Sequence, residues 1–424
     1  MCEDRPPFPE SVAVNDTADL VASAKRHLLP IYRQRELILD RGKGSRLWDI
    51  EGREYVDFAA GIAVSALGYG DPDILRALHE QAARLWHTSN VYYSEPPLRL
   101  AEELVAASGF AERVFLCNSG AEANEAAIKL VRKHAADAGR EPARRVIVTF
   151  EGSFHGRTLA TVTATAQPKY QQGYEPLPAG FRYGRLNDID ALPSLLTDEV
   201  CAVFVEPIQG EGGVVPASDA FLHALRARCD ALGALLVFDE IQCGMGRTGT
   251  LWAHQSVGVL PDVMTVAKAL GCGFPIGAML VGARAAQTMQ FGAHGTTFGG
   301  NPLAAAVARV ALAKLSAPDL LAHVVRQSHG LKAGLERIGS ELGAFSMIRG
   351  RGLMLGAVLA PALCGRAGEI LGRAAQAGLL LLQAGPDVLR FVPALTISDE
   401  DLAEGIARLE AALVGLESKS APMA

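Results

Sequence analysis

The stretch from residue 73 to residue 315 alternates short apolar runs with amphipathic segments, and this alternation constrains the fold most strongly. The apolar runs include "RVIVTF", "CAVFVEP", "ALLVFDE" and "DVMTVAK", and the helix-like "AFLHALRARCDALG" precedes the third of them. An uninterrupted apolar strand has to be covered on both faces, which is typical of a parallel sheet between two layers of helices. The sequence therefore predicts the α/β class, with a mostly parallel central sheet covered by helices.

The 424 residues divide by pattern into three zones. Residues 1–72 carry short β-like runs such as "SRLWDIEGREYVDFAAGIAV" between glycine-rich turns. Residues 316–424 carry helical segments, such as "LLAHVVRQSHGLKAGLERIGSEL", and short strands, as in an α+β domain. At ~150 residues per domain, the length fits two or three domains. We expect residues 73–315 to form a large domain, while residues 1–72 and 316–424 supply the two parts of a smaller α+β domain.

Charge and cysteine usage exclude several classes of protein. The net charge of −6, without a basic cluster, argues against nucleic acid or an anionic membrane as a partner. No stretch approaches the ~20 apolar residues of a membrane span, and the acidic, proline-rich start "MCEDRPPFPE" does not resemble a signal peptide. The seven cysteines are scattered and form no C-x-x-C pair. We therefore expect a cytoplasmic protein with reduced thiols and no metal site.

Lys268 ends the apolar run "DVMTVAK" and is an unusual residue for that setting. Lysine is rarely buried unless something pairs with it, and burial favours the neutral amine, which is the nucleophilic form. The alternative is a lysine whose stem follows the apolar surface while its ammonium reaches solvent.

Polar side chains follow the neighbouring apolar runs. Asp239 and Gln242 come after "ALLVF", and Glu206 ends "CAVFVEP". Ligands of an open parallel sheet bind outside the carboxyl ends of its strands, and a carboxylate at that depth needs a cationic or hydrogen-bonding partner. Asp239 either caps a helix, forms a salt bridge with Lys268, or holds one end of a cofactor whose other end Lys268 holds.

Three loops add further polar groups. Ser119 and Gly120 precede a helix predicted over residues 121–134, and such a helix start suits a phosphate, although serine also caps helices for structural reasons. The loop "EGSFHGRT" places an aromatic residue, a histidine and Arg157 among glycines, and "AHGTTFGGNP" supplies Thr296 and Thr297. A local hydrogen bond for the histidine and a tight turn for the threonines are the alternatives.

These groups together match the needs of one cofactor. A phosphate cradle, a flat aromatic side chain, a buried aspartate and a lysine nucleophile are what pyridoxal 5′-phosphate requires, because it is an electron sink held by lysine with an acid partner at its pyridine nitrogen. A lysine that forms an imine also benefits from an apolar setting, since desolvation favours its neutral form.

The sequence resembles the class-III (ω-amino) aminotransferases of the fold-type I pyridoxal-phosphate enzymes over nearly its whole length. The matching motifs fall in family order: "HTSNVYY", "CNSGAEANEAAIKL", "SFHGRT", "VEPIQGEGGV", "DEIQCGMGRTG", "AKALGCGFPIGA" and "HGTTFGGNPLA". The chain departs from the family pattern at "GYGDP", around Tyr69 and Asp71, where G-H-x-H-P is usual. It departs again at Cys243 and Cys272, where threonine and glycine are more familiar.

The resemblance implies a role for each matching position. Lys268 is implied as the lysine that forms the Schiff base with pyridoxal phosphate and carries protons, and Asp239 as the partner of the pyridinium nitrogen. The other implied cofactor contacts are Gln242 at the phenolic oxygen, Phe154 on the ring face, Ser119, Gly120 and Ala121 at the phosphate, and Thr297 from the neighbouring subunit. A homodimer with shared active sites, or a multiple of it, is implied as well.

The implied substrate-binding residues are Arg157, Glu206, Thr296 and Arg390. Arginine suits carboxylate binding through its bidentate geometry and permanent charge. The resemblance implies that Arg157 holds the distal carboxylate of both substrates and that Arg390 holds the proximal carboxylate of glutamate or 2-oxoglutarate. It further implies that Glu206 masks Arg390 while the ω-amine substrate is bound. Without the resemblance, Arg390 in "DVLRFVP" is better interpreted as an edge-strand charge facing solvent.

The implied reaction transfers the ω-amino group of N2-acetylornithine to 2-oxoglutarate, giving N-acetylglutamate 5-semialdehyde and glutamate, in arginine biosynthesis. Succinylornithine, succinyl-diaminopimelate, ornithine and 4-aminobutyrate are the alternative amino donors. The motifs "HTSN" and "NSGAEANEAA" favour an acylated donor but do not separate acetyl from succinyl. A non-catalytic protein of this fold commonly lacks the lysine or the cradle, whereas both are present here, and an aminomutase would not need two separate carboxylate clamps.

Overall fold

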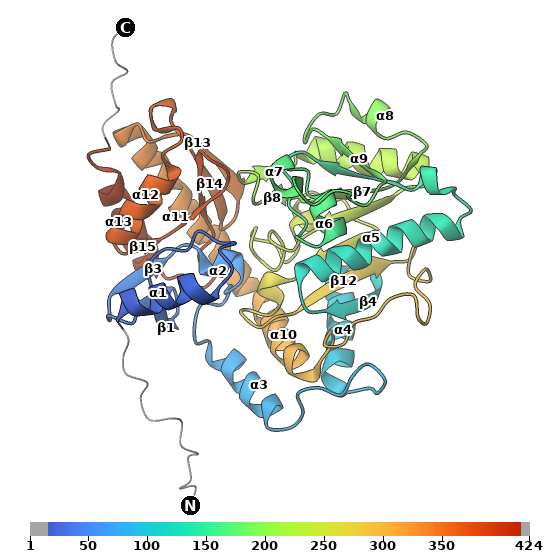
Figure 1. Ribbon diagram of the computed structural model, residues 1–424, viewed down its shortest axis with the longest axis horizontal. Coiled ribbons are helices and arrows are strands. Elements are labelled where there is room, and N and C mark those ends of the chain that lie inside the picture. The colour runs from blue at the N-terminus through green and yellow to red at the C-terminus, as the bar shows by residue number, and fades with distance from the viewer. Residues whose placement is uncertain (1–15, 417–424) are drawn as a thin grey trace, which may run out of the picture.

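The computed structural model describes residues 16–416 and contains a central seven-stranded sheet (Figure 1). The strand order is β4–β12–β11–β10–β7–β5–β6, and the five strands from β11 to β6 are parallel. This arrangement confirms the predicted α/β class with a mostly parallel central sheet. The strands are β4 (Ala111–Cys117), β5 (Val146–Phe150), β6 (Phe181–Gly184), β7 (Val200–Val205), β10 (Leu235–Asp239), β11 (Val263–Val266) and β12 (Gly277–Gly282).

Helices cover both faces of this sheet. Leu235 and Val237 of β10 pack with α5 (Gly120–Asp137), whereas the intervening β10 side chains pack with α9 (Asp219–Leu232). Successive side chains of a strand point to opposite faces, so a strand between two helical layers is apolar at every position. The other helical elements of residues 72–315 are α3 (Pro72–Ala82), α4 (Glu95–Ser108), η1 (Pro142–Arg144), α6 (Leu159–Ala164), α7 (Pro168–Gln171), α8 (Leu192–Leu195), η2 (Ala253–Ser256), η3 (Lys268–Leu270) and α10 (Pro302–Leu315).

Strand β12 runs antiparallel to both of its neighbours, β11 and β4. A parallel connection needs a crossover of a dozen or more residues, usually with a helix. Only residues 267–276 separate β11 from β12, and their one helical element is the short turn η3. The chain therefore reverses direction here, although the run "GAMLVG" continues the apolar alternation.

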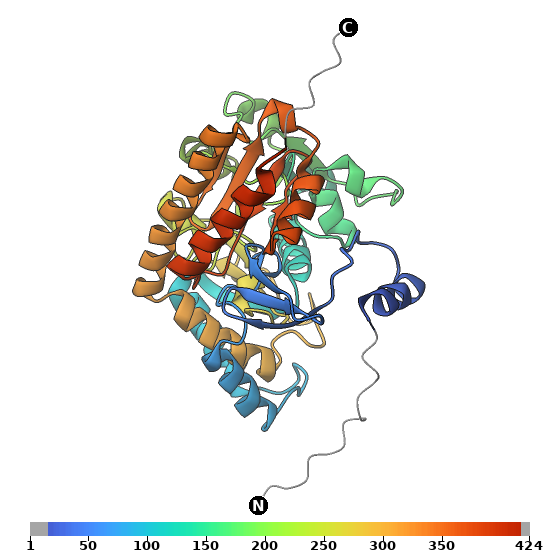
Figure 2. The ribbon, with the colours of Figure 1, turned by 90° about the vertical axis from the view of Figure 1, so that its left-hand side faces the viewer.

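Residues from the two chain ends form two smaller four-stranded sheets, side by side in Figures 1 and 2. The first has the order β1–β2–β3–β15, in which β15 pairs in parallel with β3, and the second, the C-terminal sheet, has the order β13–β14–β17–β16. The predicted domain boundaries after residues 72 and 315 remain predictions. The strands are β1 (Leu39–Lys43), β2 (Arg46–Asp49), β3 (Glu54–Asp57), β13 (Phe345–Arg351), β14 (Met354–Leu359), β15 (Leu379–Leu380), β16 (Leu382–Gln383) and β17 (Val388–Phe391).

Helices of the C-terminal residues lie outside these strands when the molecule is viewed from that side (Figure 2). They are α11 (Pro318–Leu342), η4 (Pro361–Leu363), α12 (Ala367–Gln376) and α13 (Asp399–Leu413), and α1 (Thr17–His27) precedes the first small sheet. Across residues 16–416, no helix is both long enough and apolar enough to cross a membrane.

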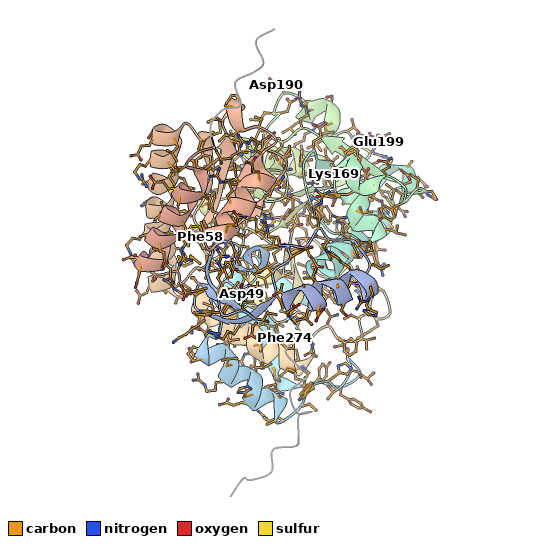
Figure 3. All side chains as sticks on the ribbon, turned by 60° about the vertical axis from the view of Figure 1, so that its left-hand side comes forward. Asp49, Phe58, Lys169, Asp190, Glu199 and Phe274 are labelled. Carbon is orange, nitrogen blue, oxygen red and sulfur yellow. The ribbon has the colours of Figure 1, made fainter. Side chains whose placement is uncertain are left out.

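Phe58, labelled in Figure 3, joins the N-terminal strands to the C-terminal sheet. Its N–H donates to the carbonyl oxygen of Leu380 at 2.9 Å, and its own carbonyl accepts from the N–H of Val392 at 2.8 Å. The buried ring meets the ring of Phe391 edge-on, with 6.3 Å between the centroids. Residues far apart in the sequence thus share one core and one backbone hydrogen-bond network.

A left-handed turn, α2 (Ala60–Ala63), follows β3 and leads into the pocket described below. The φ angles of its four residues are 44°, 61°, 65° and 62° in chain order. Asp57 holds the start of the turn, because its carboxylate accepts from the N–H groups of Ala59 and Ala60 and from the hydroxyl of Tyr69. Left-handed backbone costs an L-residue roughly 1–2 kcal/mol, so these contacts support a strained segment.

Both residues of the unusual "GYGDP" segment have structural partners. Tyr69 donates to Asp57 at 2.8 Å. Asp71 caps α3 by accepting from the N–H groups of Asp73 and Ile74, and it pairs with Lys314 of α10 at 2.6 Å. This departure from the family pattern is therefore accommodated by hydrogen bonds that connect β3, α3 and α10.

Candidate active site

Asp239 lies at the carboxyl end of β10 and is 3% exposed. One carboxylate oxygen accepts from Asn124 Nδ2 of α5 and from His155 Nδ1, each at 2.8 Å, and the other accepts from the N–H of Ile241 at 3.1 Å. The Asn124 amide is fixed in turn, because its oxygen accepts from Thr265 Oγ1 at 2.8 Å. Asp239 is therefore held rigidly by donors from three segments.

His155 is buried directly behind Asp239. Burial alone acts to lower the pKa of His155, but the hydrogen bond to Asp239 and the charge of that carboxylate outweigh burial and raise the pKa. The histidine therefore supports a negative charge on Asp239. The alternative of a local hydrogen bond for this histidine is therefore wrong, because its ring contacts Asp239 on a distant segment of the chain.

Lys268 begins η3 directly after β11, so its side chain enters the pocket from the neighbouring strand end. Its φ of 43° lies in the left-handed region, and strained backbone of this kind concentrates at functional sites. In the part of the chain that the structure describes, no carboxylate lies within salt-bridge distance of its ammonium, so the salt bridge with Asp239 does not form. Burial lowers the pKa of Lys268 to about 8, although the nearby Glu211 charge acts to raise it.

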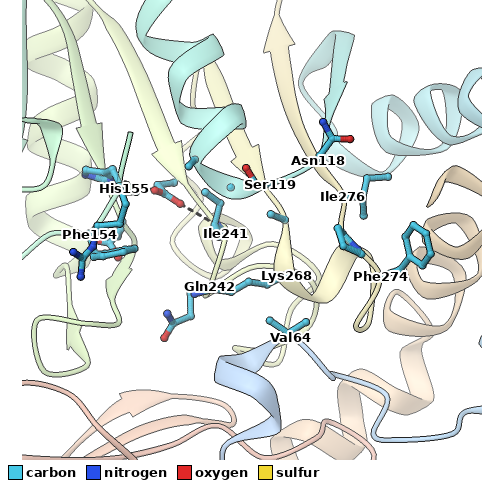
Figure 4. A pocket seen from close by; sticks show the side chains of 18 of the residues that line it. Val64, Asn118, Ser119, Phe154, His155, Ile241, Gln242, Lys268, Phe274 and Ile276 are labelled. Carbon is cyan, nitrogen blue, oxygen red and sulfur yellow. Dashed lines mark hydrogen bonds and ion pairs between the residues drawn. The ribbon is translucent and has the colours of Figure 1, made fainter. Parts of the chain in front are cut away.

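A cavity of about 440 Å³ lies between these groups (Figure 4). Lys268 extends across its middle, with Ser119 at the start of α5 on one side and Val64, which follows the left-handed turn, on the other. Apolar walls surround a few converging polar groups, as in most small-molecule sites. Nine residues singled out from the sequence line it: Ser119, Gly120, Ala121, Phe154, Arg157, Glu206, Asp239, Gln242 and Lys268.

The start of α5 supplies an anion site at one end of the cavity. Ser119 caps the helix by accepting from the N–H of Glu122 at 3.2 Å, and the first N–H groups of any helix lack partners within the helix. A Cβ on Gly120 would lie 2.8 Å from the Ile241 side chain, so any larger residue would require Ile241 to move. The residues present thus fit a phosphate at this position.

Arg390 on β17 is 2% exposed, so the alternative of an edge-strand charge facing solvent is wrong. Its Nη1 donates to Gln242 Oε1 at 3.1 Å and forms an ion pair with Glu211. Burial acts to raise the pKa of Glu211, but the charge and hydrogen bond of Arg390, together with Lys268 and Gln242, outweigh burial and the pKa is lowered. A buried cation thus stands at the edge of the pocket with a carboxylate against it.

The expectation that Glu206 covers Arg390 is wrong, because Glu211 forms that ion pair instead. The carboxylate of Glu206 accepts from the N–H groups of Phe154 at 3.0 Å and of Gly210 at 3.4 Å, and burial raises its pKa to about 8. The chain then turns through the hairpin of β8 (Ile208–Gln209) and β9 (Val215–Pro216), which lies against β13 through Arg349 Nε and the carbonyl oxygen of Gly213. That turn carries Glu211, five residues further on, to Arg390.

Arg157 lies at the exposed side of the pocket. Its guanidinium stacks over the ring of Tyr170 at 3.9 Å and lies 5.6 Å from the ring of Phe154, whereas Lys169, labelled in Figure 3, lies 4.7 Å from the Tyr170 ring. Stacking on aromatic faces orients the guanidinium while leaving its N–H edge free for a carboxylate.

Thr296 and Thr297 do not line the cavity of their own chain. Thr296 accepts from Asn118 Nδ2 and from the N–H of Gly299, each at 3.2 Å, whereas Thr297 is exposed. The role implied for Thr297, toward a neighbouring subunit, remains a prediction, as does the substrate-binding role of Thr296.

Of the two unfamiliar cysteines beside the site, Cys243 is buried and Cys272 is half-buried. Cys243 lies behind Asp239, and Cys272 contacts the carbonyl oxygen of Ala269 at 3.2 Å. Burial raises the pKa of both thiols, to about 12 for Cys272, so neither is a thiolate near neutral pH. The φ of Cys272 is 44°, a value that favours the glycine more familiar at this position.

Sequence reasoning missed Asn124, Thr265 and Glu211. Asn124 stands among alanines on the buried face of α5, and a polar side chain on such a face was a usable signal. Thr265 is likewise the one polar residue of the strand "VMTV". Glu211 gave no such signal, because only the turn after β7 decides which of the two nearby glutamates reaches Arg390.

Comparison with known proteins identifies the family. Residues 31–413 match the model of the aminotransferase class-III family. The acetylornithine aminotransferase of Xanthomonas campestris pv. campestris is 66% identical over 401 residues, which is 94% of this chain and 98% of that protein. The succinylornithine transaminase of Yersinia pseudotuberculosis is 54% identical over 387 residues, covering 90% of this chain and 93% of that protein.

Solved structures agree with this match. The N-acetylornithine aminotransferase of Stenotrophomonas maltophilia K279a has a TM-score of 0.82 at 56% identity, covering 92% of this chain and 98% of that one. The ornithine aminotransferase of Toxoplasma gondii ME49 has a TM-score of 0.90 at 31% identity, covering 94% and 95%. The fold is therefore the fold-type I architecture of pyridoxal-phosphate-dependent transferases. The chain belongs to the class-III aminotransferase family.

The pKa of Lys268 can be measured in the protein without bound cofactor. Because burial disfavours the ammonium, we expect Lys268 to titrate with a pKa of about 8 rather than the ordinary lysine value of 10.5. Competitive acetylation with limiting acetic anhydride, followed across pH by mass spectrometry, reports the midpoint. Glu211→Gln should lower it further, since the Glu211 charge raises the pKa. A midpoint near the ordinary value contradicts the assignment.

Proposed function

We propose that this aminotransferase transfers the ω-amino group of N2-acetylornithine to 2-oxoglutarate, giving N-acetylglutamate 5-semialdehyde and glutamate, as a step of arginine biosynthesis. The observation that carries the proposal is a pair of arginines: Arg157 is exposed and lines the pocket, whereas Arg390 is buried behind the lining residue Gln242 and covered by a carboxylate. Such a pocket suits two substrates that share a distal carboxylate but differ in whether a second one lies next to the reacting carbon. The 66% identity to an acetylornithine aminotransferase supports the choice of donor.

We propose pyridoxal 5′-phosphate as the cofactor, because the residues present fit it. The start of α5, at Ser119, Gly120 and Ala121, would hold the phosphate, Phe154 would cover the ring, and Gln242 would reach its phenolic oxygen. Lys268 would attach it and Asp239 would hydrogen-bond its pyridine nitrogen. When bound, the cofactor supplies an electron sink for the pair left on the substrate carbon after proton removal.

Lys268 and Asp239 would then divide the chemistry. The neutral Lys268 Nζ, favoured by burial, would accept the proton from the carbon that carries the amino group and would release it again later in the reaction. Asp239 would face the pyridine nitrogen, and His155 and Asn124 hold that carboxylate in place.

The two arginines would bind carboxylates at opposite ends of the pocket. Arg157 binds the distal carboxylate of either substrate. Glu211 covers Arg390 while acetylornithine is bound and leaves it when the proximal carboxylate of glutamate or 2-oxoglutarate arrives. In this proposal Glu206 stays under Phe154, where its hydrogen bonds keep it.

We also propose a homodimer in which Thr297 completes the phosphate site of the partner subunit. The loop after α3 and the loop that carries Thr297 form one surface, because Asn90 Nδ2 donates to the carbonyl oxygens of Thr296 and Gly299. Large apolar side chains crowd this surface, and exposed patches of this kind mark interfaces. They include Trp86, Val91, Tyr92, Tyr93 and Phe298, of which Tyr93 is 92% exposed. We further propose a cytoplasmic location, as expected from the scattered cysteines.

A donor panel tests the reaction. With 2-oxoglutarate as the common acceptor, kcat/KM for acetylornithine is expected to exceed that for ornithine and 4-aminobutyrate by about tenfold or more, which is ~1.4 kcal/mol of barrier. Succinylornithine is the second candidate donor, since a succinylornithine transaminase is 54% identical. Succinylornithine or succinyl-diaminopimelate ranking above acetylornithine would replace the proposed donor.

Borohydride reduction of the purified protein tests the cofactor and its attachment. Peptide mapping after reduction should find the cofactor on Lys268, because this amine is desolvated and faces the pocket next to Asp239. Lys169, which lies outside the cavity lining, serves as an internal control and should remain unlabelled. A label on another lysine, or none, rules out the attachment.

Substitution of the arginines separates their roles. Arg390→Ala should slow the half-reaction with glutamate by about 30-fold or more, because truncating one partner of a desolvated charge pair costs ~2–5 kcal/mol. The half-reaction with acetylornithine should change far less. Arg157→Ala should impair both, and Glu211→Gln should favour glutamate over acetylornithine. Single-turnover absorbance of the bound cofactor with each donor measures these rates.

The matched control for these variants is Arg113→Ala. Arg113 is an exposed arginine of β4 that does not line the cavity. The substitution should leave both half-reactions unchanged. Equal loss of both half-reactions in Arg390→Ala would refute the division of labour between the two arginines.

A further inference from the structure

Arg247 is a buried arginine that no part of the proposed mechanism uses. It lies in the 240–252 loop, between β10 and η2, and is 1% exposed. Within residues 16–416 no carboxylate is within salt-bridge distance of it, and its Nε and Nη2 have no hydrogen-bond partner there. Burial lowers its pKa. Burying an unpaired charge is costly, so the contacts that Arg247 does make need an explanation.

Those contacts reach the C-terminal sheet. Arg247 Nη1 donates to the carbonyl oxygen of Leu353, at 3.0 Å, and to that of Pro393. Leu353 lies in the turn between β13 and β14, and Pro393 follows directly after the end of β17, the strand that carries Arg390. One guanidinium thus bridges the same end of the neighbouring strands β14 and β17, the second of which carries Arg390.

The backbone approaches equally closely at this point. The N–H of Leu353 donates to the carbonyl oxygen of Arg247 at 2.9 Å. Gly352 has a φ of 59°, and a Cβ there would lie 2.4 Å from that same carbonyl oxygen. The turn between β13 and β14 therefore fits against the 240–252 loop without room for a side chain.

The start of the 240–252 loop lies at the pocket and is held there by hydrogen bonds. Gln242 accepts from Arg390 Nη1 at 3.1 Å. Glu240, which follows Asp239, is fully buried and accepts from the N–H groups of Ala253 and His254 and from His254 Nδ1. The loop is thus pinned at both ends, and Arg247 ties its middle to the strand of Arg390.

We propose that Arg247 is a positioning residue that sets where Arg390 lies relative to Gln242 and Lys268, and so governs the use of substrates with a carboxylate next to the reacting carbon. This inference rests on the proposed function, because it assigns Arg390 to that carboxylate. Without Arg247, two buried carbonyl oxygens lose this donor, and the end of β17 loses its contact with the 240–252 loop. Acetylornithine, whose reacting end carries no carboxylate, does not depend on that position.

The test compares Arg247→Met, which keeps length but removes charge and donors, with the wild-type holoenzyme. The half-reaction with glutamate should fall by about tenfold or more, and that with acetylornithine by less than about threefold. The matched control is Arg140→Met. Arg140 also donates to two backbone carbonyls, those of Val200 and Leu232, each at 2.7 Å, but both belong to the seven-stranded sheet and its helix α9. Its donor ratio should equal that of the wild type.

Hydrogen–deuterium exchange supplies a readout that does not depend on activity. In Arg247→Met, exchange should accelerate in residues 388–395, where Val392 and Leu395 donate to Phe58 and Ala66. In Arg140→Met that segment should exchange as in the wild type. Unchanged exchange there in Arg247→Met would overturn the proposal.

Each outcome of the kinetic comparison decides one question. Equal loss with both donors overturns the positioning role, since a merely structural residue would impair both half-reactions alike. If Arg247→Met does not fold, Arg247→Lys, which keeps the charge, is measured instead, and an unchanged donor ratio then overturns the proposal. If the wild type itself uses neither donor, the proposed function fails rather than the role of Arg247.

Discussion

The carboxylate of Asp239 depends on three hydrogen bonds, and the pocket is arranged around them. A nearly buried carboxylate is tolerated only when donors satisfy it, and here α5 supplies Asn124, the loop after β5 supplies His155, and the backbone of Ile241 supplies the third. The same α5 brings its N-terminus to the cavity, and the same loop brings Phe154 and Arg157. One buried charge thereby fixes the relative positions of an anion site, an aromatic wall and a cation.

Much of this arrangement could be predicted from the sequence, and the limits have physical causes. The apolar runs predicted a sheet covered by helices on both faces. The polar residues after those runs predicted that Asp239, Glu206 and Lys268 meet at the carboxyl ends of its strands. The direction of β12 was not predicted, although the connection of residues 267–276 is too short for a helical crossover and was a usable signal. The partner of Arg390 could not be predicted, since Glu206 and Glu211 share one motif and only the β8–β9 turn distinguishes them.

Two buried arginines illustrate different uses of the same side chain. Arg390 has a carboxylate partner, so its charge can be uncovered and covered again at moderate cost when a ligand replaces Glu211. Arg247 has only carbonyl oxygens as partners, so its bonds have no competitor among anionic substrates. The first arrangement suits exchange, and the second suits a permanent join between the 240–252 loop and the C-terminal sheet.

The left-handed turn α2 has a consequence for how this chain tolerates mutation. Three of its four residues carry a Cβ in a backbone region where glycine or asparagine would relieve strain. Replacing these residues by glycine or asparagine would relieve strain next to the pocket wall formed by Val64. The same replacements would soften that wall, so stability gained by directed evolution at this turn would be gained at the expense of turnover.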